Sequence, residues 1–109
     1  MNPFSKLFSK TLDVLPGADT EISVDLALTF EDLCMNETRK LCFAGRPSVS
    51  AILAELRKTT RSSYFSKTAL KNKWIVVLVN GENIGVVDIH RSYVDSEDSI
   101  SILQPLCGG

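Results

Sequence analysis

The stretch Ile75-Val-Val-Leu-Val-Asn-Gly-Glu-Asn-Ile84 decides the fold that this sequence predicts. It opens with the longest strongly apolar run of the chain, and a short apolar run bounded by turn residues is typical of a buried strand. The Asn80-Gly81 dipeptide that follows favours positive φ at both turn positions and is a strong hairpin signal. We therefore predict a strand over residues 74–79, a tight turn, and a short partner strand near residues 83–87.

Toward the C-terminus, residues 88–98 are expected to form a loop with a solvated acidic cluster. The cluster consists of Asp95, Glu97 and Asp98. The alternating apolar residues of 100–103 predict a last strand. Pro105 has no N–H to donate to a neighbouring strand, so the sheet should end there.

A four-residue tail follows, made of Leu106, Cys107, Gly108 and Gly109. The two glycines lack a Cβ, so the tail can thread a narrow cleft and present the carboxylate of Gly109 to an enzyme. A truncated end is the alternative interpretation. The Cys107 thiol could attack an activated terminus or form a disulfide with a partner, or the residue is simply small enough for the tail's path.

Upstream, residues 21–30 alternate strictly and predict a half-buried strand. Its apolar face consists of Ile22, Val24, Leu26, Leu28 and Phe30. Residues 31–38, which include Cys34, are polar and predict a loop. A second strand is expected over 39–44, with Cys42 on its outward face.

A helix capped by Ser48 or Ser50 is predicted next. Its buried stripe would consist of Val49, Ile52, Leu53 and Leu56. Residues 61–73 are basic and serine-rich and predict a solvated loop, in which Tyr64, Phe65 and Leu70 are candidate anchors.

The domain organisation is an extension, one domain and a tail. Residues 1–20 form the extension, in which apolar residues of 3–15 recur at helical spacing and indicate a short amphipathic helix. This helix either folds back on the domain or forms a partner-binding or disordered arm. Residues 21–105 form the domain, and 106–109 form the tail.

Composition excludes several classes of protein. The chain has 109 residues and a formal net charge of -1, which argues against a general nucleic-acid binder. It has no apolar run near the ~20 residues that span a bilayer, and its first residues lack the charged and apolar regions of a signal peptide, so we expect none. Three cysteines without metal-type spacing and a single histidine, His90, give no zinc pattern and favour a reducing, cytoplasmic setting. We interpret His90 as a surface residue.

The order strand, strand, helix, strand, short strand, strand predicts an α+β fold in which one helix crosses a sheet. Residues 75–84 and 94–109 resemble the ubiquitin-like β-grasp sulfur carriers, which include MoaD (the small subunit of molybdopterin synthase), ThiS of thiamin synthesis and related modifiers. Ser96-Glu97-Asp98 takes the place of the family's acidic turn, and Pro105 and the Gly-Gly end match its terminus. The sequence departs from the family in an acidic turn without glycine, in a single proline before the tail, in the N-terminal extension and in the 61–73 insertion.

The resemblance implies a ubiquitin-like β-grasp fold, with a mixed sheet of about five strands, one main helix packed on a face and a flexible Gly-Gly tail. It also implies a carrier and not an enzyme, with no bound cofactor. An E1-like adenylyltransferase would use ATP to adenylate Gly109, and a sulfur donor would convert it to a thiocarboxylate. Leu106, Cys107 and Gly108 would lie in that partner's active site.

The sulfur acceptor implied by the resemblance is a molybdopterin-type precursor, a thiazole or a tRNA base. The corresponding partner is a large synthase subunit or another sulfur-accepting enzyme. The family also contains modifiers, which are conjugated to target lysines through the terminal glycine, here Gly109. A β-grasp interaction domain with an inert tail is the third hypothesis. No nucleic-acid or membrane partner is expected, and docking should use an apolar patch of Leu106 and the outward residues of the last strand.

Overall fold

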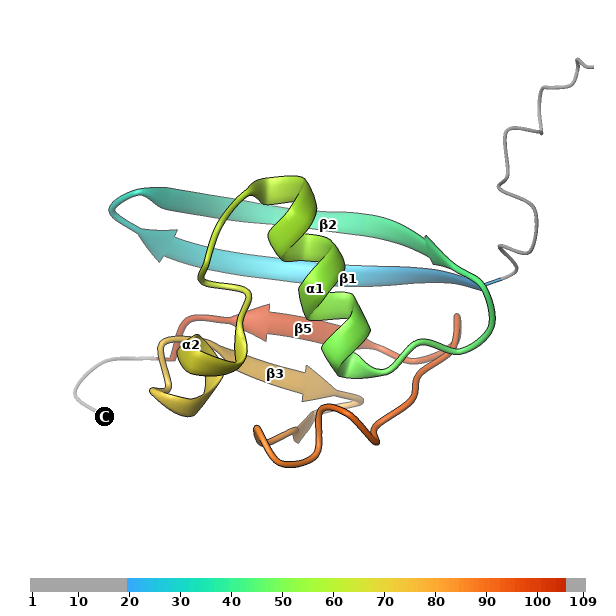
Figure 1. Cartoon of the computed structure of the whole chain (residues 1–109). Helices are drawn as coiled ribbons and strands as arrows, with labels where there is room; N and C mark the ends of the chain where they lie inside the picture. The colour runs from blue at the N-terminus through green and yellow to red at the C-terminus, as the bar shows by residue number, and fades with distance from the viewer. Residues whose placement is uncertain (1–19, 106–109) are drawn as a thin grey trace, which may run out of the picture.

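The computed structural model describes residues 20–105 and contains one sheet and two helices in that range. The main helix, α1, lies across one face of the sheet (Figure 1). The elements are β1 (Thr20–Phe30), β2 (Leu33–Phe43), α1 (Val49–Thr60), α2 (Lys67–Lys71), β3 (Val76–Val79), β4 (Glu82–Asn83) and β5 (Ile100–Leu103). The predicted helix in residues 3–15 and the tail 106–109 lie outside the described residues.

The sheet is mixed and has the strand order β2-β1-β5-β3-β4. The last strand, β5, lies in the middle, parallel to β1 and antiparallel to β3. The pairs β1–β2 and β3–β4 are antiparallel hairpins. This arrangement confirms the predicted β-grasp architecture, and it places the end of β5 between β1 and β3.

The core lies between the sheet and α1. The apolar face of β1 is buried from Ile22 to Leu28, as its strict alternation predicts. The stripe of α1 is buried as predicted; it consists of Val49, Ile52, Leu53 and Leu56. Ser48 caps this helix, because its side-chain oxygen accepts a hydrogen bond of 3.1 Å from the N–H of Ala51.

The prediction of a loop over residues 31–38 is wrong. β2 starts at Leu33 and pairs with β1 along its whole length, so only Glu31 and Asp32 form the turn. Cys34 therefore lies on a strand, where it is exposed, and Cys42 is exposed on the outward face as predicted. The alternation of β2 is broken because Glu37 and Arg39 occupy positions on the face that α1 covers.

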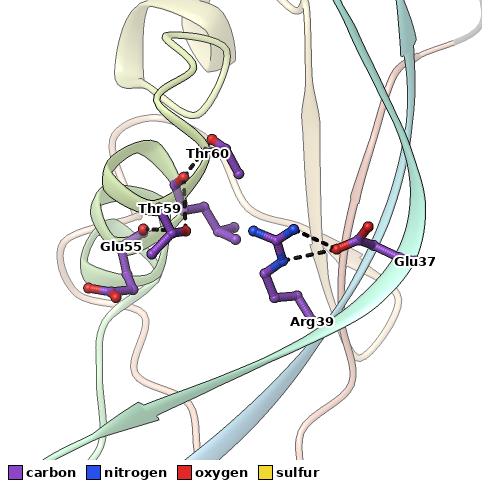
Figure 2. A network of polar contacts seen from close by, with 6 residues as sticks. Glu37, Arg39, Glu55, Thr59 and Thr60 are labelled. Atoms are coloured by element: carbon purple, nitrogen blue, oxygen red, sulfur yellow. Dashed lines mark hydrogen bonds and ion pairs between the residues drawn. The ribbon is translucent and has the colours of Figure 1, made fainter.

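These two residues form an ion pair of 2.7 Å at the edge of the sheet. Figure 2 shows the Arg39 guanidinium on the side of β2 that faces the end of α1. Both side chains keep partial access to water, so they need not lose all of their hydration. Inward-pointing charges on an edge strand are one of the features by which natural sheets oppose pairing with another chain.

The prediction of a solvated loop over residues 61–73 is also wrong. The segment contains α2, whose N-cap Ser66 accepts a hydrogen bond of 3.1 Å from the N–H of Ala69. Phe65 is fully buried and Leu70 is 7% exposed, so two of the three candidate anchors are confirmed as core residues, and the third, Tyr64, is half-buried. Arg57 donates a hydrogen bond of 2.8 Å to the carbonyl oxygen of Phe65, which ties the segment to α1.

The hairpin predicted at Asn80-Gly81 is confirmed, with φ angles of 53° and 85°. These positive values belong to the tight turn that this dipeptide favours. The flanking strands are shorter than predicted. β3 begins at Val76 because Lys73 adopts a φ of 62° and the Trp74 N–H still bonds to the carbonyl of α2's Ala69. β4 comprises only Glu82–Asn83.

Candidate functional site

The end of β5 forms a firmly held base for the C-terminal tail. The N–H of Gln104 donates a hydrogen bond of 3.2 Å to the carbonyl oxygen of Ala27. The side-chain oxygen of Gln104 accepts two hydrogen bonds from Thr29, one from its N–H and one from its hydroxyl, both at 2.8 Å. Because Pro105 has no N–H, the backbone ladder ends here and the Gln104 side chain completes the pairing with β1.

The four candidate site residues, Leu106, Cys107, Gly108 and Gly109, lie outside the described residues. The structure therefore places the base of the tail and not its end. Four fully extended residues span at most about 14 Å. Any enzyme that acts on Gly109 must therefore come within about 14 Å of Pro105, so the surface around the base lies close to that enzyme.

One part of that surface is apolar and lies on the face of the sheet away from α1. Leu103 is half-buried there and pairs directly with Val76 of β3 and Ala27 of β1. Val76 is also half-buried, and Ala27 is exposed. These three residues, which we call the outer patch, include the outward residue of the last strand that the sequence indicated for docking.

A second part of the surface is aromatic and lies at the same end of the sheet. Phe30 and Tyr64 stack with ring centroids 3.9 Å apart and an angle of 2° between the rings. Trp74 meets Tyr64 edge to face at 6.5 Å and remains 49% exposed. The three rings line an open hollow of about 270 Å³, and we call them the aromatic corner.

The connectivity places the aromatic corner at the same end of the sheet as the base of the tail. Phe30 ends β1, which runs parallel to β5, and Trp74 comes two residues before Val76, the partner of Leu103. Pro105 comes two residues after Leu103. The Tyr64 hydroxyl donates a hydrogen bond of 2.9 Å to Asp32, and this bond raises the pKa of Tyr64 because ionisation would remove the shared proton.

The acidic turn has a structural role at the opposite end of β5. The carboxylate of Asp98 accepts hydrogen bonds of 2.9 Å from the Asn80 side chain and from the N–H of Asp95. The Asn80 side chain in turn accepts one from the N–H of Ser99. These bonds, the one from Asn80 first, lower the pKa of Asp98. The turn thus fixes the start of β5 to the Asn80-Gly81 hairpin.

Between residues 20 and 105, no cluster of three or more His, Cys, Asp or Glu side chains is placed to hold a metal ion. His90 is exposed, as expected from sequence, and borders a shallow hollow beside α1. No helix in the same range is long and apolar enough to cross a membrane. What the described site offers is a fixed tail base between two contact surfaces.

Sequence reasoning missed the aromatic corner. The local pattern places Phe30 on the apolar face of a strand, makes Tyr64 a candidate anchor of a loop and puts Trp74 at the start of a strand. Only the tertiary fold brings residues 30, 64 and 74 together. An exposed tryptophan just before a buried strand is the one local signal that could have indicated a contact surface.

Comparisons with known proteins agree with this geometry. The family model described as the ThiS family matches residues 15–109. The solution structure of the HVO 2177 protein from Haloferax volcanii is similar, with a TM-score of 0.59 and 18% identity, over 83% of this chain and 87% of that one. At that identity the likeness shows the fold alone. No match was found among curated proteins.

Proposed function

This chain belongs to the ThiS family, and on that premise we propose that it carries sulfur as a thiocarboxylate on Gly109. ThiS-family proteins are small ubiquitin-like carriers and not catalysts. The proposed partner is therefore an E1-like adenylyltransferase, which supplies the active site and binds the ATP. Gly108, Cys107 and Leu106 would occupy that active site together with Gly109.

A carboxylate is a poor acyl donor because its leaving group is poor, so the proposed chemistry begins with activation of the Gly109 carboxylate. A carboxylate oxygen of Gly109 attacks the α-phosphorus of ATP and displaces pyrophosphate, which gives an acyl adenylate. A hydrosulfide-level donor then attacks the acyl carbon and displaces AMP, which leaves the thiocarboxylate. The glycines suit this role because an extended backbone without Cβ atoms can lie in a narrow cleft.

The observation that supports the proposal most directly is that the family match runs through Gly109. The described base agrees with it, because Gln104 and Pro105 end the central strand and release the chain beside exposed apolar and aromatic surface. We also propose what receives the sulfur. The acceptor is a precursor in cofactor biosynthesis of the molybdopterin type or a base in tRNA.

Adenylation provides the test. The full chain is mixed with the E1-like enzyme of its own organism and ATP, and ATP–pyrophosphate exchange is measured. We expect exchange that depends on the chain and is lost when Gly109 is deleted. Absence of exchange, with an enzyme that is active on its other substrates, would contradict the proposal. Lysine adducts formed through Gly109 without a thiocarboxylate would assign the modifier role instead.

A further inference from the structure

Positive charge is concentrated in one segment of this slightly acidic chain. Half of its 12 basic residues lie within residues 57–73, and the sequence from 56 to 81 contains no acidic residue. The six are Arg57, Lys58, Arg61, Lys67, Lys71 and Lys73. Because the whole chain has a net charge of -1 and this segment contributes +6, the remaining residues carry -7.

All six side chains are exposed, and none is neutralised within the described part of the chain. In residues 20–105 the ion pairs join Arg39 to Glu37 and Arg91 to Asp88, and neither involves the segment. Unpaired like charges within one short segment repel one another, so this concentration of charge disfavours the free protein. We refer to these six residues as the basic surface.

The basic surface borders two hollows at the two ends of α2. The first, of about 280 Å³, has Arg57, Lys67 and His90 on its wall. The second, of about 270 Å³, has Lys71 and Lys73 on its wall. No acidic residue lines either hollow. Concave surface bounded by cations can receive protruding carboxylate side chains with complementary charge.

The basic surface also reaches the base of the tail. Lys73 is next to Trp74 of the aromatic corner, and Val76, three residues further on, pairs with Leu103. The partner that takes the tail must come within about 14 Å of Pro105. Val76 also lines the second hollow together with Lys71 and Lys73, so the basic surface adjoins the surface around the base of the tail.

From this arrangement we propose that the basic surface is the docking site for an acidic surface on the E1-like enzyme that receives the tail. The inference rests on the proposed function and adds to it a second contact region, on the α1 and α2 side of the sheet. The outer patch and the basic surface meet at the second hollow, whose wall includes Val76 as well as Lys71 and Lys73. The aromatic corner supplies an apolar anchor next to the charged region, as is common at interfaces.

Charge distribution favours a protein partner over nucleic acid. Outside residues 57–73 the net charge of -7 would repel a long phosphate backbone. Nucleic-acid-binding domains are usually basic overall, with isoelectric points above about 9, whereas this chain has a value of about 5.8. A partner protein with a local acidic surface, in contrast, can contact the six cations without approaching the acidic residues in the rest of this chain.

The test compares two variants with equal charge change. Lys67→Glu/Lys71→Glu reverses two charges on α2, where both side chains are exposed. Lys40→Glu/Arg46→Glu reverses two exposed charges outside the basic surface and serves as the control with equal charge change. Because Arg46 donates a hydrogen bond of 3.4 Å to the carbonyl oxygen of Tyr93, the single variant Lys40→Glu is measured beside it. For each, kcat/KM of adenylation by the organism's E1-like enzyme is measured from 20 mM to 500 mM salt, where added salt screens charge attraction. Urea unfolding checks that each variant is folded.

We expect the α2 variant to lose about tenfold or more in kcat/KM at low salt, mainly through KM, and to show a weaker salt dependence. The control should stay within about twofold of the wild type. Equal kcat/KM for the α2 variant and the control would overturn the inference while the proposed function stands. No adenylation of the wild type by a competent enzyme would overturn both.

A parallel binding measurement addresses nucleic acid. Labelled tRNA is titrated with the wild type and with the Lys67→Glu/Lys71→Glu variant at 150 mM salt, and fluorescence anisotropy is recorded. The inference predicts no difference between them and no tight binding. Binding of tRNA by the wild type that the variant loses would assign the basic surface to nucleic acid and overturn the inference.

Discussion

Phe65 tests whether the 61–73 insertion is part of the core. Its side chain is fully buried, although the surrounding residues are basic, polar and serine-rich. Burial of a phenylalanine side chain contributes about 1.5–3 kcal/mol by transfer from water. Phe65→Ala also leaves a cavity, so the total loss in the free energy of unfolding should be about 3–5 kcal/mol.

The assay is urea unfolding followed by tryptophan fluorescence and circular dichroism. With a slope of about 2 kcal/mol/M, a loss of about 4 kcal/mol moves the midpoint down by about 2 M. This loss is a large part of the 5–15 kcal/mol that holds a typical domain together. Phe65→Leu, which keeps most of the apolar volume, should cost less and remain folded.

Lys67→Ala in the same segment is the control, because its side chain is exposed and should change stability by no more than about 0.5 kcal/mol. If Phe65→Ala also changes stability by less than about 1 kcal/mol, the segment is a solvated loop and our description of the core is wrong. That result would also remove the basis for treating the basic surface as fixed in place.

Three further predictions concern the polar contacts. Asp98→Ala should cost about 1–2 kcal/mol at neutral pH through two lost hydrogen bonds, seen in urea unfolding. Folding lowers the pKa of Asp98, so its contribution to the free energy of unfolding is fully present above the ordinary pKa near 4 and is lost as pH falls through the folded pKa. The difference in unfolding free energy between the wild type and Asp98→Ala should therefore narrow in acid. A difference that stays constant with pH would refute this. Ser48→Ala should lower stability by about 1 kcal/mol through loss of the α1 cap, whereas Ser48→Asp should largely retain it. In a variant without the other tyrosine, Asp32→Asn should bring the raised pKa of Tyr64 back toward its ordinary value in an ultraviolet titration, and an unchanged titration would exclude the hydrogen bond as the cause.

Local sequence signals were sufficient where one residue pattern determines one structure. The alternation of β1, the Asn80-Gly81 turn and the stripe of α1 each follow from periodicity or backbone preference. Pro105 indicated the end of β5 for the same kind of reason, since it cannot donate to the ladder. The candidate site at the tail stays a prediction, because residues 106–109 lie outside the described range.

Predictions from local sequence were wrong where tertiary contacts determine the structure. Glu37 and Arg39 interrupt the alternation of β2, yet the strand forms because β1 offers a continuous partner and the two charges pair with each other. Phe65 lies in a stretch with too few apolar residues to define a period, yet it is buried in the core. The aromatic corner depends on residues 30, 64 and 74, which are far apart in sequence and which no local pattern relates.

Conversion of the C-terminal carboxylate is the most direct test of the central claim. The full chain is incubated with its organism's E1-like enzyme, ATP and sulfide, and the intact protein and its C-terminal peptide are weighed by mass spectrometry. The account predicts the mass gain of one oxygen replaced by sulfur, located on Gly109 and absent when Gly109 is deleted. An unchanged mass, with an enzyme that forms a thiocarboxylate on another ThiS-family protein, would contradict it.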